Sequence, residues 1–387
     1  IYFRKLPPFV RSGRVAMRDI DAATRRVLRA KYDLGLFEDP YRYSDTARER
    51  RMLLAAEHRE AARDLARKAI VLLKNEGRTL PLSKSLGTIA VIGSLATDAR
   101  STIGNWAAAG RAEEAVTVLD GIRRAASSGT RVLHARGADS ATADTSGFAE
   151  AVRVAREADV VVLVVGEHQE QSAEANNRAF LGLPGAQEGL VRAVQATGKP
   201  VVVVLMGGRP LAISSIAETA PAIMHAWYLG TEMGNAVADV LFGDANPSGK
   251  LPVTVPRTVG QVPIYYNHKM TGRPPQAQNK YTSKYIDVPW TPLYPFGHGL
   301  SYTTFAYRNL RLSASSIGPN DTLVATVDVT NSGDRVGDEV VQLYIRDEVG
   351  SITRPVKELR GFRRITLRPG ETQTVSFTVG AADLAFF

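Results

Sequence analysis

With 387 residues, of which 44% are hydrophobic and 22% charged, the chain has the composition of a globular protein with two or three domains. The lack of cysteine excludes disulfides, thiol nucleophiles and cysteine-based metal sites. The net charge is +9, but basic and acidic residues are interspersed and no nucleic-acid-binding motif occurs, so we expect no nucleic-acid partner. No apolar run approaches the roughly 20 residues that span a membrane, so we expect no membrane partner either.

The first predicted element is an amphipathic helix over residues 17–34, ending at Gly35. Its apolar face carries Met17, Ile20, Val27 and Leu28. A single helix needs a partner to pack on, so we expect its partner domain upstream of Ile1. The given sequence shows no signal peptide. Residues 36–56 are rich in turn formers and predict a linker. Residues 57–73 predict a second helix.

From residue 87 onwards, short apolar strands alternate with helices. The expected strands cover residues 88–93, 131–135, 160–165, 200–206 and 222–227, and the expected helices cover residues 147–157, 183–197, 213–218 and 231–242. Alternation on this length scale predicts a mostly parallel sheet covered by helices on both faces, which is an α/β fold.

The pattern changes again in the last third. Residues 244–306 are rich in proline, glycine and tyrosine, and we expect an ordered connection whose aromatic side chains, including Tyr281 and Tyr285, are packed rather than ligand-binding. From residue 309 apolar and polar residues alternate, as in Leu323, Ala325 and Val327. Repeated short strands of this kind predict a small β-sandwich, which the end of the chain at Phe387 would truncate.

The most unusual stretch is residues 159–178, DVVVLVVGEHQEQSAEANNR. A buried strand ends at Gly166 and is followed by a loop with three glutamates, Glu167, Glu170 and Glu174. In open parallel sheets ligands collect beyond the carboxyl ends of the strands. The loop therefore lies at the usual position of active sites in α/β proteins. A loop that is merely exposed to solvent would have the same sequence pattern.

Other site types find little support. There is no G-x-G-x-x-G, no phosphate-binding G-x-x-x-x-G-K-[ST], no H-E-x-x-H and no G-x-S-x-G, and His225 lies in an apolar strand as a core histidine would. We therefore expect no cofactor and no metal. A carboxyl group that acts as acid or base remains, as in glycoside hydrolysis, which also needs a second carboxylate that the spacing here does not reveal.

Several motifs, in order along nearly the whole chain, resemble glycoside hydrolase family 3, especially its bacterial periplasmic β-glucosidase branch. They are KYDLGLF (31–37), AIVLLKN (69–75), GNW (104–106), EANNR (174–178), GDANPSGKLP (243–252), TGRP (271–274), NKYTSKY (279–285) and YPFGHGLSYTTF (294–305). The last is the most specific.

The resemblance implies an N-terminal (β/α)8 barrel, an α/β sandwich and a fibronectin-III-like β-sandwich. On this division residues 1–36 are the tail of the barrel, residues 37–86 a linker with a docking helix, and residues 87–250 the α/β sandwich domain. Residues 251–306 form the ordered connection, and residues 307–387 a truncated fibronectin-III-like domain.

The resemblance also implies site residues. Family members cleave with a nucleophilic Asp from the barrel and an acid/base Glu from the sandwich domain, which is Glu174 here, with Glu167 as the alternative. Trp106 is expected to be a platform for the leaving sugar, with a core tryptophan as the alternative. Arg178 would contact sugar hydroxyls or orient Glu174, with a salt bridge at the domain interface as the alternative. A simple ion pair between Glu174 and Arg178, or between Glu167 and a neighbour, is the structural alternative.

The predicted activity is that of a retaining exo-β-glucosidase, with β-glucosides or oligosaccharides as substrates and the missing barrel as partner. This chain alone would be inactive. The alternatives are a β-xylosidase or arabinosidase of the same family and a non-catalytic carbohydrate-binding or scaffold module. The resemblance places the protein in the periplasm or outside the cell, and a homodimer is left open.

Overall fold

The structure, a computed structural model, describes residues 2–385. It divides into two compact units, Ile1–His58 and Arg59–Phe387. The first unit contains α1 (Tyr2–Arg11), α2 (Met17–Asp33) and α3 (Thr46–Met52). Helix α2 confirms the predicted helix, and its apolar Met17 and Val27 are 60% and 58% exposed. Helix α1 was not predicted from the sequence, and α3 lies within the stretch that was predicted to be a linker.

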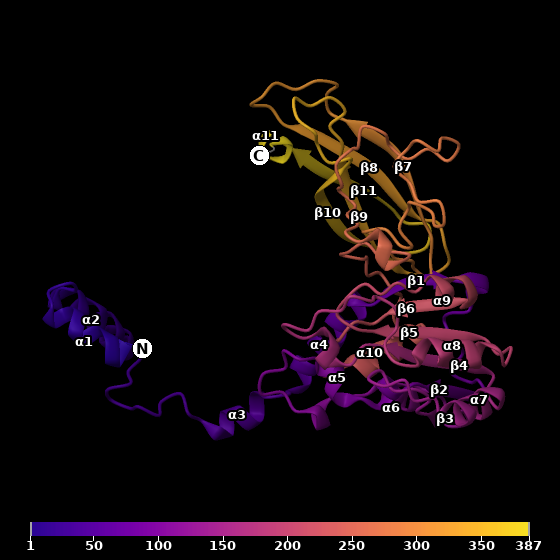
Figure 1. The fold of residues 1–387 in the computed structure, drawn as a ribbon, viewed down its shortest axis with the longest axis horizontal. Helices are drawn as coiled ribbons and strands as arrows, with labels where there is room; N and C mark the ends of the chain where they lie inside the picture. The colour runs from indigo at the N-terminus through magenta and orange to yellow at the C-terminus, as the bar shows by residue number, and fades with distance from the viewer. Residues whose placement is uncertain (1, 386–387) are drawn as a thin grey trace. The chain divides into compact units, whose positions relative to one another are not determined.

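The second unit is built on a six-stranded sheet with the order β1-β6-β5-β4-β2-β3 (Figure 1). The strands from β6 to β3 are parallel to their neighbours, and β1 is antiparallel to β6. This confirms the expected α/β class. The strands are β1 (Val71–Asn75), β2 (Thr88–Ile92), β3 (Arg131–Ala135), β4 (Val160–Gly166), β5 (Val201–Met206) and β6 (Ala222–His225).

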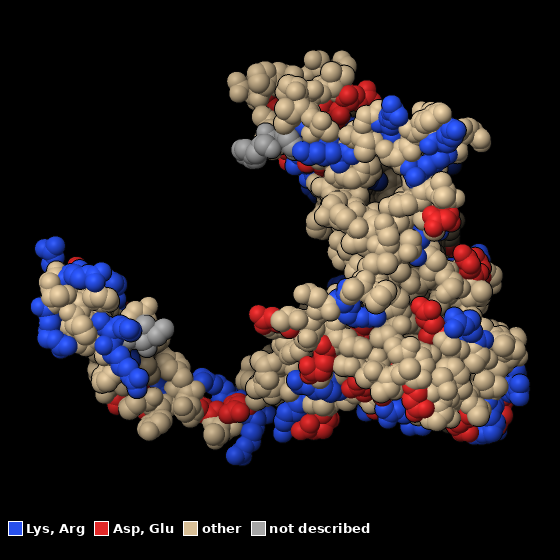
Figure 2. Space-filling model, in the orientation of Figure 1, with Lys and Arg blue, Asp and Glu red and all other residues tan. Residues whose placement is uncertain are grey.

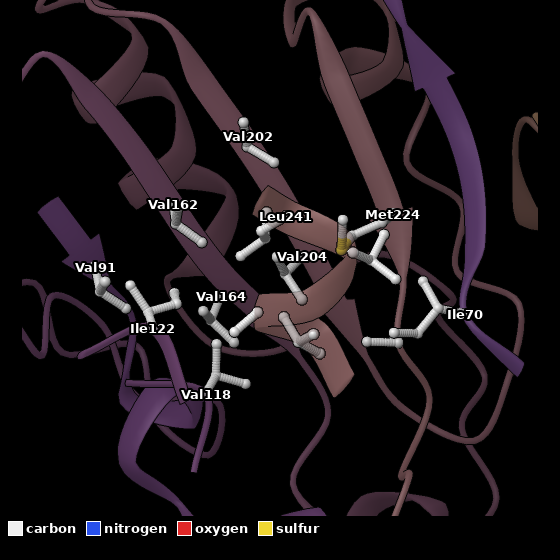
Figure 3. Packing of buried hydrophobic residues seen from close by; sticks show 14 of the residues in the cluster. Ile70, Val91, Val118, Ile122, Val162, Val164, Val202, Val204, Met224 and Leu241 are labelled. Atoms are coloured by element: carbon white, nitrogen blue, oxygen red, sulfur yellow. The ribbon is translucent and has the colours of Figure 1, made fainter. Parts of the chain in front are cut away.

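Helices cover both faces of this sheet. Residues of α4, α6 and α10 pack with Val91, Val162 and Val204 on one face, and residues of α7, α8 and α9 pack with Leu163 and Val203 on the other. Figure 3 shows Ile122 of α6 and Leu241 of α10 on the first of these faces. Every residue of β4 is buried, because the strand is covered on both sides. The helices are α4 (Ala56–Ala69), α5 (Ala99–Ile103), α6 (Val118–Ala125), α7 (Phe148–Arg156), α8 (Gln187–Gln195), α9 (Ser214–Thr219) and α10 (Met233–Phe242).

Strand β1 corrects the sequence analysis, which extended the preceding helix to residue 73. The helix ends at Ala69 and the chain continues as a strand, in which Val71 pairs with His225. Val71, Leu72 and Leu73 are all buried. A continuous apolar run fits a buried helix or a buried strand equally well, and here pairing with the free edge of β6 decides between them.

Residues 244–304 connect the sheet to a β-sandwich and contain one short helix, η5 (Val259–Gln261), among their described residues. The expectation that their aromatic side chains are packed is wrong for several: Tyr265 is 60% exposed, Tyr281 68% and Tyr285 44%. Tyr294, in contrast, is buried and packs against the sheet core.

The β-sandwich contains a two-stranded sheet, β10-β9, and a three-stranded sheet, β11-β8-β7. Its core includes Val329, Val341 and Ile365, so the alternation in the sequence marked the inward face of β8 and β9. The elements are β7 (Phe305–Leu312), β8 (Leu323–Asn331), β9 (Gly337–Ile345), β10 (Glu358–Leu367), β11 (Thr372–Val379) and α11 (Ala381–Leu384).

Lys and Arg lie among Asp and Glu over the α/β part on the face that Figure 2 shows. Between residues 2 and 385, no helix combines the length and the apolar character that crossing a membrane requires.

His225, at the end of β6, is a core histidine as expected, but it is not fully satisfied. It is 3% exposed, stacks on Trp227 with ring centroids 3.7 Å apart, and its Nε2 has no hydrogen-bond partner among the described residues. Burial lowers the pKa of His225 to about 4, because the charged imidazolium is poorly solvated there.

This pKa predicts a stability that falls in mild acid. Below about pH 6.5 the unfolded chain binds a proton at His225 that the folded chain takes up only near pH 4, so stability is lost as pH falls through this window. From pH 7 to pH 5 the loss from this residue is about 2 kcal/mol. Urea titrations at pH 7 and pH 5 measure the free energy of unfolding. Its loss between the two pH values should be about 2 kcal/mol smaller for His225→Phe than for the parent chain. The exposed-site control His268→Phe should behave like the parent chain, and equal losses in all three proteins would contradict this account.

Candidate active site

The candidate site lies at the carboxyl edge of the parallel strands. From β2 the chain runs outwards to β3, and it returns to β4 on the other side of β2. The loops that follow β2 and β4 therefore leave the sheet in opposite directions, which makes this point the switch point where open α/β sheets bind ligands. Trp106 follows β2, and Glu167 and Glu174 follow β4.

Glu167 is the first residue after β4 and is fully buried. Its Oε1 lies 2.5 Å from Nη1 of Arg178 and its Oε2 lies 3.0 Å from Nε of Arg209. The Ser172 hydroxyl also donates to Oε2. We call Glu167, Ser172, Arg178 and Arg209 the Glu167 cluster. Both carboxylate oxygens are occupied by charge-assisted hydrogen bonds, which are among the strongest in proteins.

Two glycines make room for this arrangement. Gly166 has a φ of 139°, and a Cβ there would overlap the carbonyl oxygen of Met206 on the neighbouring strand β5. Gly207 directly follows β5 with a φ of 151°. The backbone of Gly166 is also held by the buried side chain of Gln187, whose Oε1 accepts from Gly166 N–H at 2.8 Å. The turn that delivers Glu167 into the cluster is thus fixed by backbone geometry.

The loop beyond Glu167 folds back over the cluster. Nη2 of Arg209 donates to the carbonyl oxygens of Gln171 and Asn176, the latter at 3.0 Å. The Asn176 side chain donates to the carbonyl oxygen of Glu170 at 2.6 Å. Ala175, between these anchors, has a φ of 62°. The guanidinium group of Arg209 therefore orders the loop by binding two of its backbone carbonyls.

Glu174 lies between the anchored carbonyls and is exposed. The ion pair with Arg178, considered above as the structural alternative, is not formed, since Arg178 pairs with Glu167 and donates to the carbonyl oxygen of Gly182 at 2.9 Å. Within residues 2–385, Glu174 has no hydrogen bond or ion pair. Its carboxyl group is accessible from outside, whereas that of Glu167 is not.

Trp106 is 75% exposed, which excludes the alternative of a core tryptophan within the described chain. The segment that carries Trp106 contacts the glutamate loop directly at Ser101 and approaches it through Tyr228, which follows β6. The Ser101 hydroxyl accepts from Gln169 N–H at 3.1 Å, and a Cβ on Gly104 would touch Tyr228. The Tyr228 hydroxyl lies 2.9 Å from the carbonyl oxygen of Glu167, and burial raises the pKa of Tyr228 to about 12. Trp106 and Glu174 therefore stand on two loops that are packed together.

Ser172, Arg209 and Tyr228 were not predicted as site residues. Only Arg209 had a signal, since it follows the paired glycines at the end of β5, the strand next to β4. No group of three or more His, Cys, Asp or Glu residues in the described part of the chain is arranged to hold a metal ion.

Two family models match this chain. The glycosyl hydrolase family 3 C-terminal domain matches residues 70–302, and a fibronectin type III-like domain matches residues 339–387. Among curated proteins, the chain is 48% identical to the periplasmic beta-glucosidase of Salmonella typhimurium over 100% of its length and 54% of the relative. It is 45% identical to a beta-xylosidase of Formosa agariphila, over 95% of the chain and 51% of the relative. The chain thus spans about half the length of these relatives.

A solved structure extends the likeness to the fold. The beta-glucosidase of Listeria innocua in complex with isofagomine superposes with a TM-score of 0.90 at 38% identity, covering 99% of this chain and 53% of that one. The matched model covers residues 70–302, which include the whole α/β sheet and the glutamate loop. Together these findings show that the chain belongs to glycosyl hydrolase family 3, in which it corresponds to the C-terminal domain and a fibronectin type III-like domain.

Proposed function

We propose that this chain supplies the acid/base carboxyl group of a retaining exo-β-glucosidase, and that the group is Glu174. The observation that carries the proposal is the contrast between the two glutamates at the switch point. Glu174 is exposed on an ordered loop, whereas Glu167 is fully buried between two guanidinium groups. An acid/base group must come within hydrogen-bond distance of the substrate oxygen, and only an accessible carboxyl can do so without unfolding the loop.

The reaction takes place in two steps and uses a nucleophilic Asp from a barrel domain. The curated Salmonella relative is long enough to contain such a domain, since this chain covers only 54% of it. The Asp attacks the anomeric carbon, the glycosidic C–O bond breaks, and Glu174 donates its proton to the leaving oxygen. Water then attacks the glycosyl ester, Glu174 accepts its proton, and the Asp is released. Residues 1–36 belong to the end of that barrel in this proposal, which the exposed apolar residues of α2 support.

Trp106 is the proposed platform for the leaving sugar, because an exposed indole can cover the apolar face of a pyranose ring. Arg178 has both terminal nitrogens engaged within the protein, so its contact with sugar hydroxyls stays a prediction. The name of the Salmonella relative supports glucose as the sugar and a periplasmic location for this protein. A β-xylosidase is the second candidate, because the 45% identical Formosa relative carries that name.

The division of labour between domains can be tested by activity. Residues 1–387 alone should hydrolyse p-nitrophenyl β-glucoside at a rate near that of buffer, because the attacking Asp lies in the barrel. The complete enzyme, meaning this chain together with its barrel domain, should turn the substrate over at rates typical of enzymes, roughly 1–1000 per second. The same assay with the β-xyloside identifies the sugar. Rapid turnover by residues 1–387 alone would contradict the proposal.

A further inference from the structure

We propose that the Glu167 cluster is a positioning device that sets the place of Glu174 for proton transfer, an inference that rests on the proposed function of Glu174. Because Glu167 is fully buried, its carboxylate would not contact a substrate directly. The cluster acts through Arg209, whose guanidinium group joins the buried Glu167 carboxylate to the backbone on both sides of Glu174.

The contacts of Arg209 account for the shape of the loop. Its Nε donates to Glu167 at 3.0 Å, and its Nη2 donates to the carbonyl oxygens of residues 171 and 176. Glu174 lies between those two carbonyls and, among the described residues, makes no hydrogen bond of its own that would hold it. Its position is therefore inherited from the backbone that Arg209 holds.

Arg178 anchors the far end of the same loop. Its Nη1 lies 2.5 Å from Glu167 and its Nη2 donates to the carbonyl oxygen of Gly182 at 2.9 Å. Ser172 adds a third link, since its hydroxyl donates to Glu167 and accepts from Gly208 N–H at 3.2 Å. One buried carboxylate thus ties together the ends of β4 and β5 and the loop between residues 171 and 182.

Burial makes this arrangement stiff. The side chains of Arg178 and Arg209 are only 18% and 20% exposed, and Glu167 is inaccessible. Loss of one partner would leave a buried charge uncompensated, so the cluster holds one geometry rather than several. A fixed loop matters for catalysis, because a displacement of about 1 Å can lower a rate about 100-fold.

The inference predicts which substrates suffer when the cluster is damaged. Protonation by Glu174 is needed for an alkyl β-glucoside, whose leaving oxygen is strongly basic, and hardly for 2,4-dinitrophenyl β-glucoside. In the complete enzyme, Arg209→Met should lower kcat/KM by roughly 10- to 100-fold for the alkyl glucoside and by less than about 3-fold for the activated one. Arg209→Lys keeps the charge but cannot bind Glu167 and two carbonyls in the same plane, so it should show the same selectivity more weakly.

A double-mutant cycle with Glu174→Gln gives the deciding result. If Arg209 acts only through Glu174, then Arg209→Met should lower the rate by less than about 3-fold once Glu174 has been replaced. An equal loss for both substrates, or an equal loss in the Glu174→Gln background, would overturn the inference. Full activity of Glu174→Gln on the alkyl glucoside would instead overturn the proposed function, so the two failures are distinct.

Asp239→Asn provides a matched control, because Asp239 is 2% exposed and pairs with Arg63 and Arg67 in a cluster between α4 and α10. Asp239→Asn should lower the melting temperature without changing the ratio of kcat/KM between the two substrates.

Hydrogen exchange on residues 1–387 gives a readout that does not depend on activity. The amides of Gln171 and Asn176 form hydrogen bonds within the loop. They should exchange at least about 10-fold faster in Arg209→Met or Arg209→Lys than in the parent chain, and at the parent rate in Asp239→Asn. Unchanged exchange in both Arg209 variants would overturn the inference.

Discussion

Replacing Glu174 by alanine in the complete enzyme is expected to lower kcat/KM for alkyl β-glucosides by about 100- to 10,000-fold, the usual contribution of general acid–base catalysis. The reason is that the leaving oxygen must then depart without a proton. Because Glu174 is exposed and no described hydrogen bond depends on its side chain, the substitution should leave folding intact. Steady-state kinetics on alkyl and 2,4-dinitrophenyl glucosides, together with a melting curve, measure both effects.

Azide should restore turnover of the activated glucoside by Glu174→Ala. The truncated side chain leaves space at the reacting carbon, and a small anion can attack the glycosyl ester there without help from a base. The matched control is Glu170→Ala, which removes another exposed carboxylate of the same loop and should retain nearly full activity. Rescue in Glu167→Ala, combined with no rescue in Glu174→Ala, would transfer the role to Glu167.

The substitution Gly166→Ala is expected to destabilise the α/β unit by more than about 3 kcal/mol. The added Cβ would overlap the carbonyl oxygen of Met206, and the φ of 139° is strained for any residue with a side chain. Relief of the overlap requires β4 and β5 to separate at the position that delivers Glu167. Urea denaturation of residues 1–387 measures the loss.

Gly198→Ala serves as its control. Gly198 also has a positive φ, 74°, but a Cβ there has no neighbour within 4 Å. It should cost only about 1–2 kcal/mol, from backbone conformation alone. Equal losses for the two variants would mean that the close approach of β4 and β5 at Gly166 contributes nothing to stability.

Most strands of the parallel sheet were predictable because they are short apolar runs, as in Val160–Gly166. Strand β1 could not be predicted, because Val71 to Leu73 fit a helix equally well. The pairing with the edge of β6, which makes it a strand, is a tertiary contact. Helix α8 begins at Gln187 rather than near residue 183, because the preceding residues turn around Gln187 and Gly185. Local sequence does not contain such tertiary contacts.

The position of the candidate site could be predicted from the sequence, but the difference in burial between its two glutamates could not. A glutamate-rich loop beyond a buried strand indicated the switch point, but nothing in the spacing distinguishes a buried Glu167 from an exposed Glu174. The distinction comes from Arg209, which lies 42 residues away in sequence and reaches Glu167 because β4 and β5 are neighbours. Arg178 illustrates the same limit, since it is nearer to Glu174 in sequence yet pairs with Glu167.

The most direct test of two glutamates with separate roles is a crystal structure of the complete enzyme trapped as its 2-fluoroglucosyl ester. The account predicts a Glu174 carboxylate within about 3 Å of the water or leaving-group oxygen at the anomeric carbon. Glu167 should still be bound to Arg178 and Arg209, out of contact with the sugar. A structure in which Glu167 has left its two arginines to reach that oxygen, with Glu174 pointing to solvent, would contradict the account.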